Sequence, residues 1–265
     1  MNTIKGKLLK IPMLFNLWNF LEFLFDKSQS FLKKGSKVEC NLCGNSFKEF
    51  KKHGLDSNAI AKHNIIGAGI RKSKCYNCGS VDRDRLLFEF LKKFDLNNLK
   101  VLHVAPEISV FEKLKHFPNY YVGDLDIERY KKFENIIRTD ITNLYQFSKN
   151  TFDLIICNHV LEHIIEDVKA IKELHRVVKK NGSVILNVPI MEKNYKTLYD
   201  PAIVSQKDRH ENYCQFDHVR LYGQDFFDFI EKFGFKSLKF LPDSLLIEKL
   251  GLNAKESIFH FLKTN

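Results

Sequence analysis

The chain has 265 residues, enough for one α/β domain and a small additional module. Its 44% hydrophobic and 28% charged residues are typical of a soluble globular protein. The net charge of +10 is not evenly spread: residues 1–99 hold 18 Lys and Arg against 9 Asp and Glu, whereas residues 100–265 hold 24 against 23. A uniformly basic protein is therefore excluded. The basic N-terminal region is either a solvated face or a surface for nucleic acid, anionic glycan or membrane.

The first segment, residues 1–35, is predicted to be an amphipathic helix. Residues 8–25 are strongly apolar, but they are too few and too often interrupted for a transmembrane span. Polar residues recur every three or four positions at Asn16, Asn19 and Glu22, which gives the helix a narrow polar stripe. Two interpretations stay open: a helix lying on the inner face of an anionic membrane, and a helix covering an apolar patch of the protein itself.

Residues 36–80 contain two copies of a Cys-x-x-Cys-Gly motif, separated by 31 residues. Four thiolates suit a tetrahedral zinc ion, and a closed four-cysteine site is structural because no coordination position is open to water. Paired motifs of this kind indicate a metal and a reducing, cytoplasmic compartment rather than a disulfide scaffold. The alternative is a module that has lost its metal or forms redox pairs. The predicted zinc ligands are Cys40, Cys43, Cys75 and Cys78.

From residue 82 onward, helical and strand patterns alternate. The apolar strands are nearly continuous runs, as expected when helices cover both faces of a parallel sheet. Helices are expected at about 82–95, 109–116, 165–179 and 224–233, strands at 100–104, 120–124, 152–157 and 183–188, a long irregular insert at 191–221, and further apolar runs at 235–241 and 257–262.

Polar residues follow these strands where each one ends, which is the ligand-binding edge of an open α/β sheet. The turn after the first strand has no glycine, which counts against a dinucleotide phosphate and suits a ligand without a pyrophosphate. Asp124 is placed to accept hydrogen bonds from ribose hydroxyls, with Asp126 as its close competitor, and Asp140 is placed to meet an adenine amino group. Each aspartate alone is also a common turn residue.

The run Thr151–His163 is the most informative part of the chain. It predicts a buried strand that breaks at Asn158 and His159 and turns at once into a helix. On that helix, His163 would lie one turn after His159 and on the same face. Two histidines at the carboxyl edge of a sheet indicate an active site.

The chain from residue 100 resembles class I S-adenosylmethionine-dependent methyltransferases. The resemblance is carried by Val101–Glu107, Asp124, Asp140, Phe152–His163, Glu173–Val178 and Asn181–Gly182. More narrowly, it resembles a bacterial subgroup in which a four-cysteine ribbon precedes the methyltransferase domain. That narrower likeness is carried by Arg83, Arg85–Leu87, His103–Glu107, Asn187–Ile190 and Gln215–Gly223.

The resemblance implies a Rossmann-like, doubly wound, seven-stranded methyltransferase sheet over residues 81–265, preceded by a zinc ribbon. It also implies S-adenosylmethionine as the cofactor. The residues expected to bind it are His103, Val104, Ala105, Glu107, Asp124, Asp140 and Asn158.

Methyl transfer to a hydroxyl needs alignment and a base. His159 is the first choice for that base, His163 would orient it or bind the acceptor, and His218 is the second candidate. Any of the three also has the alternative role of a hydrogen-bonded framework histidine. The residues expected to bind an acidic acceptor are Arg209, Asp217 and Arg220.

Three functions are compatible with this sequence. The first is O-methylation of a small molecule or glycan, since the resembled subgroup is associated with surface-polysaccharide genes; the insert would shape the acceptor site. The second is methylation of an RNA base, supported by the basic ribbon but not by interleaved aromatic residues. The third is a cofactor-binding scaffold without activity, disfavoured by the retained polar residues at the strand ends.

Overall fold

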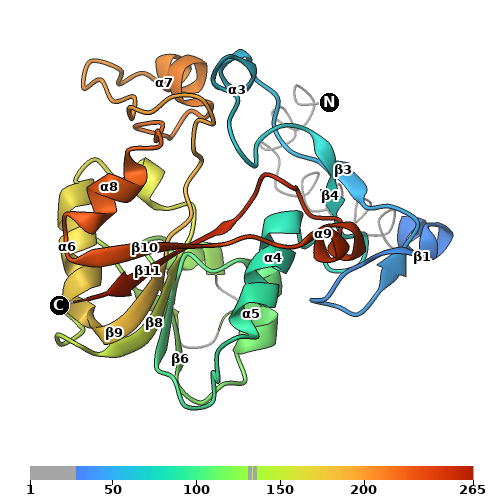
Figure 1. The fold of residues 1–265 in the computed structure, drawn as a ribbon, viewed down its shortest axis with the longest axis horizontal. Helices are drawn as coiled ribbons and strands as arrows, with labels where there is room; N and C mark the ends of the chain where they lie inside the picture. The colour runs from blue at the N-terminus through green and yellow to red at the C-terminus, as the bar shows by residue number, and fades with distance from the viewer. Residues whose placement is uncertain (1–27, 131–132, 134–135, 265) are drawn as a thin grey trace.

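The computed structural model describes residues 28–130, 133 and 136–264 (Figure 1). The segment 8–25, with its expected amphipathic helix, lies outside the described residues. Within the described ranges, no helix is long and apolar enough to cross a membrane.

A seven-stranded sheet forms the centre of the molecule (Figure 1). Its strands are β5 (Val101–Val104), β6 (Tyr120–Asp124), β7 (Ile136–Arg138), β8 (Phe152–Cys157), β9 (Val178–Ile185), β10 (Phe235–Phe240) and β11 (Ile258–Lys263). They lie in the order β10-β11-β9-β8-β5-β6-β7, with β9, β8, β5, β6 and β7 parallel to one another. Strand β11 runs antiparallel to both β9 and β10. The seven-stranded, Rossmann-like sheet is thus the one that the sequence predicts.

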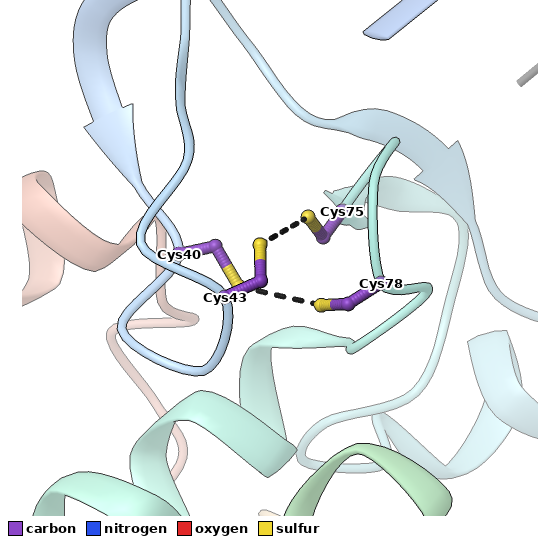
Figure 2. Close-up of side chains that lie close together, drawn as sticks. All are labelled: Cys40, Cys43, Cys75 and Cys78. Atoms are coloured by element: carbon purple, nitrogen blue, oxygen red, sulfur yellow. Dashed lines mark hydrogen bonds between the residues drawn. The ribbon is translucent and has the colours of Figure 1, made fainter. Parts of the chain in front are cut away.

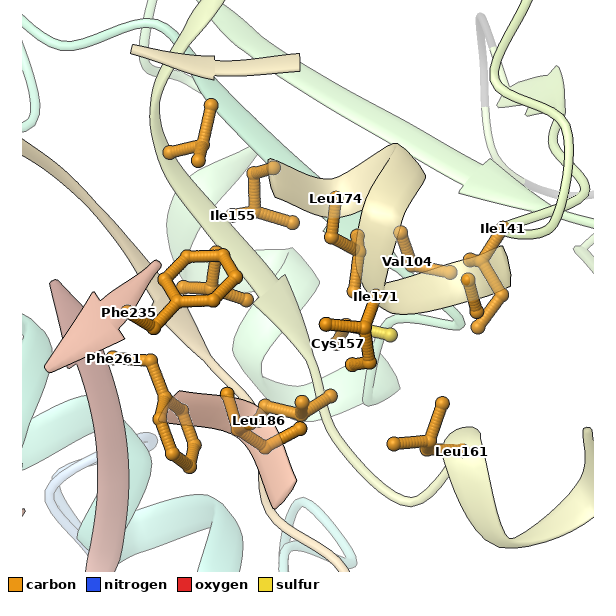
Figure 3. Close-up of a cluster of buried hydrophobic side chains, with 14 of the residues drawn as sticks. Val104, Ile141, Ile155, Cys157, Leu161, Ile171, Leu174, Leu186, Phe235 and Phe261 are labelled. Atoms are coloured by element: carbon orange, nitrogen blue, oxygen red, sulfur yellow. The ribbon is translucent and has the colours of Figure 1, made fainter. Parts of the chain in front are cut away.

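Helices cover both faces of this sheet (Figure 1). Helices α4 (Asp82–Leu91) and α5 (Ile108–Leu114) lie on one face, and α6 (Asp167–Val177) and α8 (Phe226–Glu231) on the other. Strand β8 shows why its sequence is apolar throughout: Ile155 and Cys157 pack toward α6, whereas Leu154 and Ile156 pack toward α4 and α5. Figure 3 shows the α6 side of this core.

The cysteine-rich module is built from two small antiparallel sheets. One pairs β1 (Lys34–Glu39) with β2 (Ser46–Phe47), and the other pairs β3 (Lys51–His53) with β4 (Arg71–Lys74). The residues between the two cysteine motifs, 44–74, form the spacer of this module, and α3 (Asn58–His63) lies within it. Helix α9 (Ser244–Leu250) packs beside β1, so a late segment of the chain returns to the module before β11 (Figure 1).

Buried Arg85 joins the module to the rest of the protein. Its guanidinium donates to the carbonyls of Ser73 and Ser80 in the module and to those of Leu250 and Gly251 after α9, over distances of 2.8–3.3 Å. It also lies over the Phe50 ring, 3.9 Å from its centroid. This buried side chain therefore adds hydrogen bonds to the apolar cluster that packs the module against the sheet domain.

Several predictions about elements need correction, among them the strand expected at 183–188, which is β9 at Val178–Ile185 and begins directly after α6. The run after β8 does not enter a helix at once: a 3₁₀ turn at Leu161–His163 comes first, and α6 begins only at Asp167. The insert is not wholly irregular, because it contains α7 (Gln206–Tyr213). The short strand β7 and helix α9 were not expected, and α4 ends four residues earlier than predicted.

Candidate active site

The carboxyl ends of three parallel strands lie side by side and carry the predicted cofactor residues. In the register of the sheet, Val104 is level with Gly123 on one neighbour and Cys157 on the other. Ala105, Asp124 and Asn158 therefore come together at one edge of the sheet.

A hydrogen-bonded chain of side chains crosses this edge. His103, fully buried, lies 2.8 Å from the Tyr120 hydroxyl through Nδ1 and 2.9 Å from the Glu107 carboxylate through Nε2. The second oxygen of Glu107 accepts from the Asn158 amide over 3.4 Å. Burial raises the pKa of Glu107, but the hydrogen bond and charge of His103 lower it by more, so that the pKa lies below its ordinary value. The site therefore presents an ionised carboxylate.

The glycine-free turn after β5 adopts a conformation that normally favours glycine. Ala105 has φ +49°, in the left-handed region, and its N–H donates to the Gly123 carbonyl over 2.8 Å. The main chain thus makes the tight turn without glycine, with Val104 as the last strand residue.

The two predicted aspartates differ in their surroundings. Asp124 ends β6 and is 8% exposed; one carboxylate oxygen accepts from the backbone of Asp126 at 2.7 Å. Asp140 is exposed, and one of its oxygens accepts from both the N–H and the hydroxyl of Thr142 over 2.8 Å. Asp140 is therefore a turn residue just beyond β7, and its adenine contact stays a prediction.

His159 occupies the break after β8 in a left-handed conformation, with φ +54°. Its N–H donates to the Asn187 carbonyl at 2.8 Å, which fixes the break against β9. Its Nδ1 lies 3.5 Å from Oε1 of Glu162, whose side chain is only 3% exposed. Burial raises the pKa of Glu162, but His159, His218 and His163 lower it by more. A buried carboxylate thus faces three histidines.

His163 does not follow His159 on a helical face, because only the 3₁₀ turn separates them. It turns instead toward the insert, where its Nδ1 donates to the Asp217 carbonyl at 3.3 Å and lies 3.5 Å from the Asp217 carboxylate. The ring of His163 stands edge-on to that of His218, with centroids 4.8 Å apart. All three predicted catalytic histidines therefore gather around Glu162.

The two predicted arginine ligands lie elsewhere. Arg220 is 5% exposed and pairs with Asp167; it also donates to the carbonyls of Ile164 and Ile165 at 3.0 and 2.8 Å. Its guanidinium thus holds the segment before α6. Arg209 lies on α7 and donates to the Ile203 carbonyl at 3.5 Å. Neither arginine lines the cavity of about 370 Å³ beside the histidines, which is where an acceptor would bind.

A cavity of about 370 Å³ lies beside the histidine cluster. The sheet edge contributes His159 and Pro189, and the insert contributes Cys214, Gln215 and His218. The opposite wall comes from the spacer of the cysteine module, with the residues His53–Leu55, Ile60, Ile65–Gly69, Arg71 and Ser73. The long spacer between the two cysteine motifs therefore forms a wall of the cavity. It packs on the insert through a small apolar cluster that includes Ala59, Ile65 and Tyr213.

Three charged cavity residues were missed by sequence reasoning: Arg71, Asp82 and Glu256. Arg71 donates to both oxygens of Asp82, at 2.5 and 2.9 Å, and approaches Glu256 only to 3.6 Å. Burial and the charge of Asp82 raise the pKa of Glu256 to about 8. Asp82 directly precedes the Arg83–Leu87 motif, so the sequence offered a motif that could have led to it. Glu256 lies between α9 and β11, and no sequence motif surrounds it.

The four cysteines of the module converge, as Figure 2 shows. Sγ of Cys40 lies 3.6 Å from that of Cys78, and Sγ of Cys43 lies 3.7 Å from that of Cys75. Four sulfurs at zinc–sulfur distances of about 2.3 Å in a tetrahedron would be about 3.8 Å apart. All four lie within 4.8 Å of one another, so their arrangement fits a four-coordinate zinc.

Comparisons with known proteins point to one kind of domain. A family model described as a methyltransferase domain matches residues 120–186. An uncharacterized protein of Methanocaldococcus jannaschii is 34% identical over 113 residues, which are 40% of this chain and 49% of the relative. The chain therefore spans about half the length of the curated relative that it matches.

Two solved structures illustrate the structural likeness. A SAM-dependent methyltransferase from Archaeoglobus fulgidus matches 68% of this chain and 94% of its own at 16% identity, with a TM-score of 0.45. A protein from Pyrococcus horikoshii matches 69% of this chain and 90% of its own at 20% identity, also with a TM-score of 0.45. The family match indicates that residues 120–186 are similar to a methyltransferase domain, and the seven-stranded sheet is consistent with the Rossmann-like methyltransferase fold.

Proposed function

We propose that this protein transfers a methyl group from S-adenosylmethionine to an oxygen of a sugar or surface-glycan precursor. The observation that carries the proposal is the cavity beside His159, at the same sheet edge as Glu107 and Asp124. Its volume of about 370 Å³ is within the range of small-molecule sites. Walls on three sides favour a compact acceptor over a base held within a folded RNA.

The side chains at the carboxyl edge of the sheet suit the proposed cofactor. S-adenosylmethionine, when bound, supplies an electrophilic methyl group on a positively charged sulfur. The ionised carboxylate of Glu107 suits a positively charged ligand, and its orientation is fixed by His103 and Asn158. The carboxylate of Asp124 accepts from the backbone of Asp126 and lies beside the Tyr130 hydroxyl; in the proposed complex it would accept from ribose hydroxyls.

His159 is the proposed base. It lines the cavity, and Oε1 of Glu162 faces its Nδ1 at 3.5 Å. The imidazole would accept the proton of the acceptor hydroxyl at Nε2 while the Glu162 carboxylate stabilises the resulting positive charge. The polar side chains of Arg71, Asp82 and Glu256 on the opposite wall would bind polar substituents of the acceptor.

We also propose that Cys40, Cys43, Cys75 and Cys78 bind a structural zinc ion. The sulfur distances support this, as does the Asn77 N–H, which lies 3.4 Å from Sγ of Cys75. The zinc would hold the two ends of the spacer in place, and with them one wall of the cavity.

Calorimetry with S-adenosylhomocysteine tests the cofactor assignment. Asp124→Asn should weaken binding at least about tenfold, since a charged hydrogen-bond acceptor contributes about 1.5–3 kcal/mol. Asp95→Asn, at an exposed aspartate after α4, is the control and should bind as the wild type does. If the wild-type chain fails to bind, the proposed function is wrong.

Mass spectrometry of surface glycan and ribosomal RNA from a deletion strain identifies the acceptor. With that acceptor in hand, His159→Ala should keep cofactor binding but lower turnover at least about 100-fold. A methyl missing from ribosomal RNA instead of glycan would overturn the proposed acceptor.

A further inference from the structure

Glu162, His163 and His218 form a cluster of which the proposed base uses only Oε1 of Glu162. The first two belong to the 3₁₀ turn after β8, and the third to the insert. The Val219 N–H donates to the Glu162 carbonyl at 2.9 Å, which holds the two segments together. One ligand atom from each of the three side chains lies within 4.8 Å of the others.

The hydrogen bonds of both histidines determine which ring nitrogen is free. Nδ1 of His218 lies 2.9 Å from the Tyr213 carbonyl, and Nδ1 of His163 lies 3.3 Å from the Asp217 carbonyl. A carbonyl oxygen only accepts, so Nδ1 carries the proton in each ring. In the neutral rings the lone pair is therefore on Nε2. Metal-binding histidines usually show this arrangement, with the second nitrogen donating to a carbonyl or carboxylate.

Two acceptor atoms in the cluster are buried without a partner. Nε2 of His218 and Oε2 of Glu162 form no hydrogen bond, and the two residues are 1% and 2% exposed. Oε1 of Glu162 faces His159, so Oε2 is the atom left for another ligand. Both unpartnered atoms carry lone pairs, and a cation bound by the cluster would satisfy them.

We propose that Glu162, His163 and His218 bind a divalent transition-metal ion. Two imidazole nitrogens and one carboxylate oxygen are a ligand set of zinc and its first-row neighbours rather than of magnesium or calcium. Ligand atoms around such an ion lie about 3–3.5 Å apart, from bonds of about 2.0–2.2 Å. The cluster would therefore contract slightly on binding, and the His163 side chain, 31% exposed, has room to turn.

The site would leave coordination positions open beyond its three protein ligands. His218 and His159 both line the cavity, so an ion held by His218 would lie at the edge of the cavity, with an open position toward the acceptor. There it would polarise an acceptor hydroxyl and lower its pKa, which assists removal of the proton by His159. This role rests on the proposed function, whereas the binding of the ion does not.

Cobalt(II) is the probe that separates this site from the cysteines. The full-length, zinc-loaded chain is titrated with Co²⁺ by calorimetry and by absorption spectroscopy. We expect one Co²⁺ per chain without the thiolate-to-cobalt charge-transfer band that replacement of zinc among the cysteines would give. Glu162→Gln and His218→Gln should weaken binding at least tenfold. Glu166→Gln and His210→Gln, exposed residues in the same two segments, are the matched controls and should bind as the wild type does.

If the wild-type chain takes up no Co²⁺ beyond the cysteine site at millimolar concentration, the proposal is wrong. Equal binding by the wild type and the Glu162→Gln variant would also overturn it. Should His218→Gln not fold, His163→Gln alters a partly exposed side chain and tests the same ligand set. S-adenosylhomocysteine binding is measured on the same samples. Cofactor binding without Co²⁺ binding overturns only the metal site, and the reverse overturns only the proposed function.

Discussion

Glu256 is the side chain whose environment departs furthest from that of a carboxylate in water. Arg71 is engaged with both oxygens of Asp82, so that Glu256 is left with a contact at 3.6 Å and an Oε2 without a hydrogen bond. Its pKa is raised to about 8, from an ordinary value of 4.5, first by burial and then by Asp82. The carboxyl is therefore protonated at neutral pH in the folded chain and ionised in the unfolded chain.

This raised pKa predicts a loss of stability as pH rises. The folded state holds the Glu256 proton more tightly than the unfolded state does. The stability gained from this proton is therefore fully present below about pH 4.5 and is lost as pH rises to about 8. Between pH 5 and pH 8, the wild type should lose on the order of a few kcal/mol in the free energy of unfolding. Glu256→Gln should not show this loss. Urea denaturation at both pH values measures it, with exposed Glu248→Gln as the control. An unchanged pH dependence in Glu256→Gln would contradict the assignment.

The contact between α4 and α9 depends on Arg85, which donates to four backbone carbonyls and stacks on Phe50. Arg85→Met keeps the length and apolar stem of the side chain but leaves those carbonyls without a donor. We expect a loss of about 3–5 kcal/mol, and a melting temperature lower by about 10 °C, since each kcal/mol shifts a chain of this size by about 2–4 °C.

The control for this variant lies two residues earlier in the same helix. Arg83 is exposed, so that Arg83→Met removes the same charge without breaking a buried hydrogen bond. Scanning calorimetry compares the two variants. If they melt together, the buried guanidinium does not hold the module to the sheet domain.

Sequence patterns predicted the elements correctly where both faces of a strand are buried. The central strands are predictable because both faces are covered, and an unbroken apolar run such as Leu154–Cys157 has few other interpretations. Helix α7 was missed because Gln206–Tyr213 has no apolar stripe; only Tyr213 is buried. The break at His159 was placed correctly, but its left-handed backbone was not foreseen, so the histidine spacing was assigned to a helix that begins only at Asp167.

The site was only partly predictable for a similar reason. Residues at strand ends can be assigned to one edge because parallel strands end together, as Asp124 and Asn158 do. The cavity wall made by the spacer and Glu256 depends on how distant segments pack, and no local pattern reports that. Arg220 was assigned to ligand binding from its residue type, whereas its neighbours Ile164, Ile165 and Asp167 engage it in the framework.

On the scale of the whole molecule, the cysteine module and the sheet domain share one cavity. The module supplies the spacer wall, the sheet supplies His159, and the insert supplies His218. Gly54 and Gly69 meet within the spacer so closely that a Cβ on Gly54 would lie 2.1 Å from the Gly69 carbonyl oxygen. The shape of this wall therefore depends on β3 and β4 staying paired, and these strands are anchored by the two cysteine motifs.

Loss of the proposed zinc should lower the thermal stability of the protein but leave its affinity for the cofactor almost unchanged. Without metal, four thiolates within 4.8 Å of one another repel, and the anchors of the spacer are released. The cofactor edge is held by His103, Tyr120 and Asn158 within the sheet, so its geometry should persist. Cys78→Ser should therefore lower the melting temperature by several degrees while changing the affinity for S-adenosylhomocysteine less than about threefold.

Cys214→Ser, at a buried cysteine outside the module, should keep both the zinc content and the effect of chelators on melting. An unchanged melting temperature in Cys78→Ser would mean that the module does not need the metal, because an exposed thiol alone contributes little to folding.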